Sequence, residues 1–222
     1  MNSAVIQLLV LAGIAIFLIL RLRSVLGTRE GYEKPRTSVS GPADARSSAR
    51  RDFEVIEGGV DRDITDHVEE GSDAAKALAA MKLTDPSFQV SDFLHGARGA
   101  YEMILMAFES GQLDEVKDFL GEDVFQTFVD VVAAREDQGV QVEANFVGIR
   151  EISLQDSTFD RATNTGEVTV KFVGELTSVV RNSEGEIIEG DPNQIKRQRD
   201  VWTFSRQMTG NDPNWVLIAT GE

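Results

Sequence analysis

The spacing of apolar residues changes at Gly139, and this change constrains the fold more than any other feature of the chain. Before Gly139, apolar residues recur at helical spacing, as they do over residues 93–108. After Gly139 they alternate with polar residues, first over residues 142–146 and again over residues 168–176. Helices followed by strands predict an α+β domain with an antiparallel sheet, because a parallel sheet needs helices between its strands.

Four helices and four strands follow from this pattern. The helices are predicted at residues 73–82 with Ser72 as N-cap, from Ser91 as N-cap to Gly111, at 113–120, and from Glu122 to Arg135. The strands are predicted at 142–146, 168–176, 201–205 and 215–219, with turns at 182–185 and 190–192. We expect a strongly bent four-stranded antiparallel sheet, wrapped around the helices as a cone with an apolar pocket.

An uninterrupted apolar run, residues 4–20, precedes this domain. Its 17 residues include one polar residue and no charge, and a helix of that length spans about 26 Å, close to a hydrocarbon core of about 30 Å. No basic residue precedes the run, whereas Arg21, Arg23 and Arg29 follow it, which is the reverse of a secretory signal peptide. We therefore predict a single transmembrane anchor over residues 1–26, with the N-terminus outside and the rest of the chain in the cytoplasm.

Charge divides the rest of the sequence into a basic and an acidic part. Residues 21–51 carry a net charge of +5 and residues 52–222 one of −20, and residues 52–73 contain few apolar side chains. We predict a mostly disordered linker over residues 27–82, basic and then acidic, and a folded domain over residues 83–222. The basic residues either attract anionic lipid headgroups or only orient the anchor. The acidic domain argues against nucleic-acid binding, because it leaves no basic face for phosphates.

The predicted domain contains five distinctive segments: DPSF at 85–88, FLHGARGAYEMILMAFESG at 93–111, AREDQG at 134–139, DVWTFSR at 200–206 and DPNWVLIAT at 212–220. Together they resemble the Tim-forty-four-like domain family. This family includes the C-terminal domain of the mitochondrial inner-membrane import-motor scaffold and domains of bacterial membrane proteins. The resemblance implies the cone-shaped fold of the nuclear-transport-factor-two superfamily, a large apolar pocket, and association with anionic lipid such as cardiolipin. In mitochondria, the family tethers an Hsp70 chaperone to a protein-translocating channel.

The long N-terminal half of the mitochondrial scaffold, which recruits the chaperone and contacts the channel, has no counterpart in this sequence. The predicted membrane helix and the short linker stand in its place. Lipid contact and the pocketed fold are therefore implied by the resemblance, and chaperone recruitment is not. The simplest interpretation is a bacterial protein anchored in the inner membrane, with a periplasmic N-terminus and a cytoplasmic C-terminal domain.

Aromatic residues of the domain are the candidates for lining a pocket or groove: Phe128, Phe146, Phe172, Trp202, Phe204 and Trp215. Large aromatic side chains are most often buried in a core, so core packing is the simpler role for each of them. The small residues Ala144 and Gly174 share strand faces with two of these candidates. Small side chains at these positions leave space for a cavity.

No catalytic or metal-binding constellation stands out in the sequence. The histidines His67 and His95 are far apart, there is no cysteine, and neither a nucleophile-elbow nor a phosphate-binding-loop motif occurs. We predict no enzymatic activity, no cofactor and no metal. His95 is expected to lie on the surface, or to have its hydrogen bonds satisfied, rather than to act as a base.

Three functions remain open on the sequence. The leading hypothesis is a non-enzymatic adaptor that holds a protein partner, from translocation or membrane-protein assembly, at the cytoplasmic face of the inner membrane. The second is a lipid- or apolar-ligand-binding module, whose pocket holds an acyl chain while the basic linker contacts anionic headgroups. The third is a pocket enzyme, which requires a buried Asp or Glu that faces the cavity.

Overall fold

The computed structural model describes residues 61–210 and 212–221. The predicted anchor and its flanking residues Arg21, Arg23 and Arg29 lie outside this part of the chain, so the anchor stays a prediction. Within the described part, no helix is both long and apolar enough to cross a membrane. Helices come first and strands afterwards: α2 (Arg62–Thr65), α3 (Asp73–Thr84), α4 (Val90–Ser110), the 3₁₀ turns η1 (Leu113–Glu115) and η2 (Lys117–Phe119), α5 (Glu122–Asp137), β1 (Gln141–Asp160), β2 (Thr165–Arg181), β3 (Ile187–Gly190), β4 (Lys196–Gln207) and β5 (Val216–Gly221).

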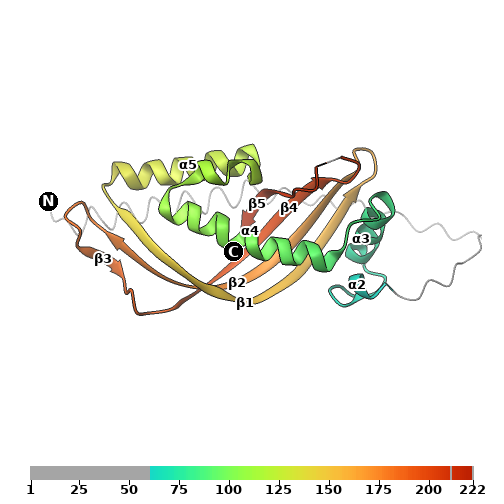
Figure 1. Ribbon diagram of the computed structural model, residues 1–222, viewed down its shortest axis with the longest axis horizontal. Helices are drawn as coiled ribbons and strands as arrows, with labels where there is room; N and C mark the ends of the chain where they lie inside the picture. Colours follow the sequence, from blue (N-terminus) through green and yellow to red (C-terminus); the bar gives the residue numbers. More distant parts are fainter. Residues whose placement is uncertain (1–60, 211, 222) are drawn as a thin grey trace, which may run out of the picture. The chain divides into compact units, whose positions relative to one another are not determined.

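The strands form one antiparallel sheet in the order β1-β2-β4-β5, and β3 pairs with the C-terminal end of β2. Strands β1 and β2 are 20 and 17 residues long, and register shifts interrupt their pairing. Such irregularities bend a strand locally, so the long hairpin curves and α4 lies along its concave side (Figure 1). The predicted α+β architecture with an antiparallel sheet is confirmed, and β3 is an additional strand that the alternation did not indicate.

The core lies between α3, α4 and the inner face of the sheet. Burial alternates along the first half of β2, so it repeats the alternation seen in the sequence. Tyr101, in the middle of α4, is fully buried against Phe172 of β2 and Trp202 of β4. One face of α4 supplies most of the helical side of this core: Val90, Phe93, Leu94, Ala97, Tyr101, Ile104, Leu105 and Ala107.

The folded domain begins earlier than the predicted boundary at residue 83. Helices α2 and α3 place Ile64, Leu78 and Met81 in the core, where 5%, 0% and 0% of their surface is exposed. The prediction of a mostly disordered linker is therefore wrong for residues 61–72, and the helix predicted over residues 73–82 belongs to the folded domain. The few apolar residues of this segment suffice, because α3 packs on β1 and β2 and α2 packs on α3 and α4, which removes nearly all of the surface of these three side chains from water.

Acidic residues in this early segment cap helices instead of keeping the chain unfolded. Asp61 caps α2 by accepting a hydrogen bond from the N–H of Asp63 at 3.1 Å. The predicted helix over residues 73–82 is confirmed as α3, and its predicted cap is confirmed too. The hydroxyl of Ser72 accepts a hydrogen bond from the N–H of Ala75 at 3.1 Å.

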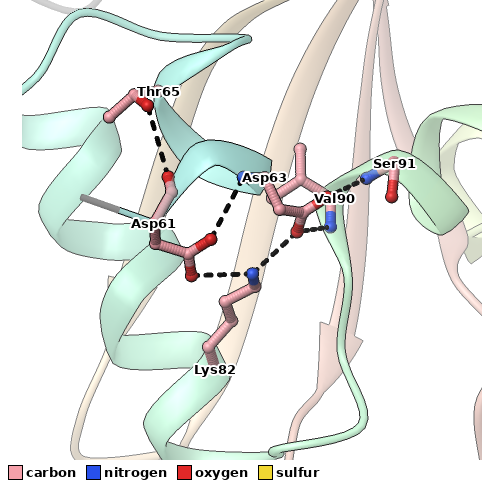
Figure 2. A network of polar contacts seen from close by, with 6 residues as sticks. All are labelled: Asp61, Asp63, Thr65, Lys82, Val90 and Ser91. Atoms are coloured by element: carbon pink, nitrogen blue, oxygen red, sulfur yellow. Dashed lines mark hydrogen bonds and ion pairs between the residues drawn. The ribbon is translucent and has the colours of Figure 1, made fainter. Parts of the chain in front are cut away.

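Helix α4 is capped by a side chain from α2 (Figure 2). The carboxylate of Asp63 accepts hydrogen bonds from the backbone N–H groups of Val90 at 2.7 Å and Ser91 at 2.9 Å. The ammonium group of Lys82, on α3, lies 2.7 Å from Asp63 and 2.8 Å from Asp61. The predicted N-cap role of Ser91 is wrong, because α4 starts at Val90 and Asp63 satisfies its first N–H groups. The network joins three helices at one point.

We expect Asp63→Asn to destabilise the domain and to weaken its response to acid. Burial alone would raise the pKa of the Asp63 carboxyl, but hydrogen bonds from Lys82, Ser91 and Val90 outweigh it and hold this pKa well below its usual range. The carboxylate therefore stabilises the domain above the unfolded pKa of about 4, and this contribution is lost as the pH falls through the folded pKa. Asparagine keeps an acceptor but loses the charge, so stability should fall by about 1–2 kcal/mol at neutral pH. Urea unfolding at neutral pH and through the acid range measures both effects.

Asp66→Asn is the matched control, because this exposed residue follows the same short helix. Its free energy of unfolding should differ from that of the parent protein by no more than about 0.5 kcal/mol. Equal behaviour of the Asp63 and Asp66 variants at every pH would show that the interhelical cap does not stabilise the domain.

The remaining helices agree with the prediction in place but not in detail. The segment predicted as one helix over residues 113–120 folds as two 3₁₀ turns, which still bury Leu113 and Val116. The helix predicted from Glu122 is confirmed as α5, but its apolar face is less buried than expected. Within α5 only Val124 is buried, whereas Phe128 is half-buried and Val131 is exposed.

Candidate functional site

The aromatic residues predicted to line one pocket lie in three different places. They are Phe146, Phe172 and Trp202 in a core cluster around Tyr101, Phe128 in contact with Phe108 between α5 and α4, and Phe204 and Trp215 at a pocket. Core packing accounts for the first three and for Phe128. The pocket interpretation applies to Trp215, whereas Phe204, which is only 2% exposed, borders the pocket from the core.

Tyr101 is the centre of the aromatic core cluster. Its ring stacks on that of Phe172 with centroids 4.5 Å apart, and its centroid lies 4.8 Å from that of Trp202. Its hydroxyl donates a 2.5 Å hydrogen bond to Asp200, and burial together with this carboxylate raises the pKa of Tyr101 above its usual value. A Cβ atom at Gly174 would lie 2.7 Å from the Tyr101 hydroxyl oxygen. The space that Gly174 was predicted to leave for a cavity is therefore filled by Tyr101.

Among the residues that the structure describes, no acid–base pair lines the pocket that contains Trp215, where Asp92 and Arg206 are the charged lining residues. Glu109, whose pKa is raised by burial, lines two other pockets. The second carboxylate oxygen of Asp200 accepts a hydrogen bond from Gln198 at 3.1 Å, so both of its oxygens are occupied. His67 is half-buried, and His95 is exposed, as was expected for His95. Neither histidine lines the pocket that contains Trp215. In the described residues, no cluster of three or more His, Asp or Glu side chains could hold a metal ion.

The pocket lies between the first half of α4 and the ends of β4 and β5, and we call it the Trp215 pocket. Its volume is about 300 Å³. Aromatic rings form its walls: the Phe93 centroid lies 4.7 Å from that of Trp215 and 5.9 Å from that of Phe204. The residues that line it are Ser87, Phe88, Gln89, Asp92, Phe93, Gly96, Ala97, Ala100, Phe119, Phe204, Arg206, Pro213, Asn214 and Trp215.

Arg206 is the one cation among these lining residues. The carbon of its guanidinium lies 5.3 Å from the Trp215 ring centroid and 5.8 Å from that of Phe88, and the group forms an ion pair with Asp85. Hydrogen bonds from Ser87 and from Arg206 hold the pKa of Asp85 below its usual range. The Arg206 side chain is only 10% exposed, and its Nε atom has no hydrogen-bond partner in the described part of the chain. A buried donor without an acceptor costs about 1–3 kcal/mol.

Sequence reasoning found two of the lining residues and missed the others, although a signal for them was present. Phe88, Arg206 and Asn214 lie in the segments DPSF, DVWTFSR and DPNWVLIAT, which carry the family resemblance. Segments that lie far apart in the sequence but carry the same family resemblance are candidates for forming one site. The assembled pocket can enclose an apolar group, and the one acidic residue lining it, Asp92, is exposed.

The sequence profile of the family described as the Tim44-like domain matches residues 74–222. Relatives with this domain are the mitochondrial import inner membrane translocase subunit TIM44 of Mus musculus, 28% identical over 151 residues, and of Homo sapiens, 26% identical over 151 residues. Subunit TIM44-1 of Arabidopsis thaliana is 24% identical over 152 residues. These matches cover 66% of this chain and 32–33% of each relative, so the chain spans about a third of the length of these relatives.

Among solved structures, the intermembrane space region of the chloroplast protein ARC6 is similar at 10% identity, over 58% of this chain and 94% of that chain, with a TM-score of 0.38. A score this low carries no argument about function. The profile match is of a different kind, because it covers more than half of the chain and includes every residue that lines the Trp215 pocket. It also confirms the resemblance carried by the five sequence segments. The chain belongs to the Tim44-like domain family.

Proposed function

We propose that this protein is a membrane-anchored, non-enzymatic adaptor, which holds a partner of protein translocation or membrane-protein assembly at the cytoplasmic face of a bacterial inner membrane. The Trp215 pocket carries this proposal, because it offers aromatic walls to a partner and lacks a buried acid–base pair. The relatives from mouse and human are named as subunits of a mitochondrial import translocase of the inner membrane, which supports a place beside such a machine.

The predicted anchor supplies the membrane part of this proposal. Arg21, Arg23 and Arg29 would orient it with a periplasmic N-terminus, and the linker up to residue 60 would let the domain reach partners near the membrane surface. In this arrangement, Trp215 contacts the partner, and Phe204, which is only 2% exposed, packs behind the pocket wall. Phe146, Phe172 and Trp202 support the fold from the core instead.

A lipid- or apolar-ligand-binding module is the second candidate. The observation that favours it is again the aromatic lining of the Trp215 pocket, which would also suit an acyl chain. The net charge of +5 over residues 21–51 would add attraction to anionic headgroups. The two candidates differ in what the domain binds at the membrane. It binds a protein partner in the first case, and a lipid or apolar ligand in the second.

Affinity purification from native membranes separates these functions. The full chain is compared with a chain that lacks residues 1–51, which keeps every residue of the Trp215 pocket. We expect subunits of a translocation or assembly machine to be recovered with the full chain and lost with the truncated one, because the anchor raises the local concentration of the domain at the membrane. Recovery of lipid with both chains, and of protein with neither, would replace the adaptor by the ligand-binding module.

A further inference from the structure

Two glycines in α4 have no role in the packing of the domain. A glycine in a helix interior costs about 1 kcal/mol relative to alanine. A Cβ atom added at Gly96 or at Gly99 would meet no other atom within 4 Å, so neither residue is needed for close packing within the described structure. Both are exposed, but Gly96 lines the Trp215 pocket and Gly99 does not. Gly96 thus leaves a bare stretch of helix backbone beside the pocket, which a second backbone can approach closely.

Arg206 contributes to the charge of the pocket. Its side chain lines the pocket and is nine-tenths buried, and its Nε atom is closed to solvent. Its positive charge is already balanced by Asp85, and Asp92 adds a further negative charge to the lining. A carboxylate or phosphate would be repelled by these two acids, whereas an uncharged group would not. The charges therefore favour an uncharged peptide segment over the headgroup of an anionic lipid.

The size and the walls of the pocket agree with a peptide. A volume of about 300 Å³ is at the lower end of the range of about 300–1,000 Å³ that is typical of ligand sites. Phe93 and Trp215 are in contact, with ring centroids 4.7 Å apart, and together they form one rigid aromatic wall against which a large apolar side chain can pack. Single apolar anchors in such pockets supply most of the affinity of many protein interfaces.

We propose that the Trp215 pocket binds a peptide segment of a protein partner. One large apolar side chain packs against Phe93 and Trp215 beside α4, and the peptide backbone passes over Gly96. The inference rests on the adaptor function and narrows it, since it names the site and the chemistry of the partner.

Fluorine NMR on the full chain in lipid nanodiscs tests this site. The chain has two tryptophans, so labelling with 5-fluorotryptophan gives two resonances: Trp215 reports on the pocket and Trp202, 3% exposed, reports on the core. The Trp215→Phe variant assigns them. The probes are the uncharged peptide acetyl-Ser-Ala-Phe-Ala-Ser-amide, the same peptide with alanine in place of phenylalanine, and palmitate. We expect the phenylalanine peptide alone to shift the Trp215 resonance saturably, with the Trp202 resonance unchanged.

Gly96→Leu and Gly99→Leu form a matched pair of variants. Each adds the same side chain in open space on the same helix, but only the first fills the pocket. Gly96→Leu should weaken binding of the phenylalanine peptide by at least about tenfold, whereas Gly99→Leu should change it by less than about twofold. An unchanged Trp202 resonance in both variants shows that the fold is kept. Equal weakening by the two variants, or a Trp215 shift with palmitate but not with the peptide, overturns the proposal.

The same variants separate this inference from the adaptor function. If Gly96→Leu still recovers the membrane machine that the parent chain recovers, the adaptor stands and the peptide site is wrong. If the parent chain recovers no protein at all, the adaptor fails, whatever the peptide does.

Discussion

Replacing Gly174 with alanine is expected to lower the free energy of unfolding by about 3 kcal/mol, and the midpoint of thermal unfolding by about 6–12 °C. The new Cβ would lie 2.7 Å from the hydroxyl oxygen and 3.0 Å from a ring carbon of Tyr101. That ring cannot move aside easily, because it is fully buried and stacked on Phe172. Relief of the contact therefore requires a shift of β2 or loss of the hydrogen bond to Asp200. Thermal and urea unfolding measure the change.

Gly148→Ala is the matched control for this prediction. Gly148 lies in the neighbouring strand β1, and a Cβ atom there would meet nothing within 4 Å. The control should therefore change the stability by no more than about 0.5 kcal/mol. A Gly174→Ala protein as stable as the Gly148→Ala protein would show that the core around Tyr101 is not tightly packed.

A double-mutant cycle with Tyr101→Phe tests whether the hydroxyl group is the cause. Phenylalanine removes the atom nearest to the new Cβ, so Gly174→Ala should cost less in this background than in the parent protein. We expect a coupling free energy of at least about 1 kcal/mol between the two positions. Strictly additive effects would assign the cost of Gly174→Ala to the strand backbone instead.

The regular elements could be predicted from the sequence because burial and periodicity agree in them. Strand β2 has one face in the core, so its alternation is visible in the residues 168–176. Strand β3 was missed because all four of its residues are exposed, which leaves no alternation to detect. Helix α2 was missed for a different reason: it has four residues and one buried side chain, Ile64, and its place depends on the contact of Asp63 with α4. Contacts between distant segments leave no local pattern.

The candidate site was also difficult to predict, because it depends on contacts between distant segments. Trp202, Phe204 and Arg206 are alternate residues of β4 and lie on one face of the sheet, as the alternation predicts. Nevertheless Trp202 packs on Tyr101 in the core, Phe204 is equally buried but borders the pocket, and Arg206 lines the pocket. Alternation assigns a face to each residue, but the position of α4 above that face decides where the core ends and the pocket begins. The six aromatic candidates could therefore be found from the sequence, but not divided among core and pocket.

The membrane anchor is the second prediction with a large effect, and the absence of cysteine from the chain makes it directly testable. Single cysteines are introduced by Ser3→Cys, before the apolar run, and by Ser183→Cys, in the exposed turn between β2 and β3. We expect a membrane-impermeant maleimide to label the first variant in intact spheroplasts and the second only after lysis. The physical reason is that Arg21, Arg23 and Arg29 are retained on the cytoplasmic side of the membrane.

Deleting residues 1–26 decides between the two roles left open for the basic residues. The truncated chain keeps a positively charged stretch from residue 29 to residue 51. If these residues only orient the anchor, the truncated protein leaves the membrane fraction completely, at low as well as at high salt. If they bind headgroups, part of it stays on the membrane at low salt and is released as the ionic strength rises, because exposed charges are then screened. Labelling of Ser183→Cys in intact spheroplasts would contradict the topology itself, and the adaptor would then face the opposite side of the membrane.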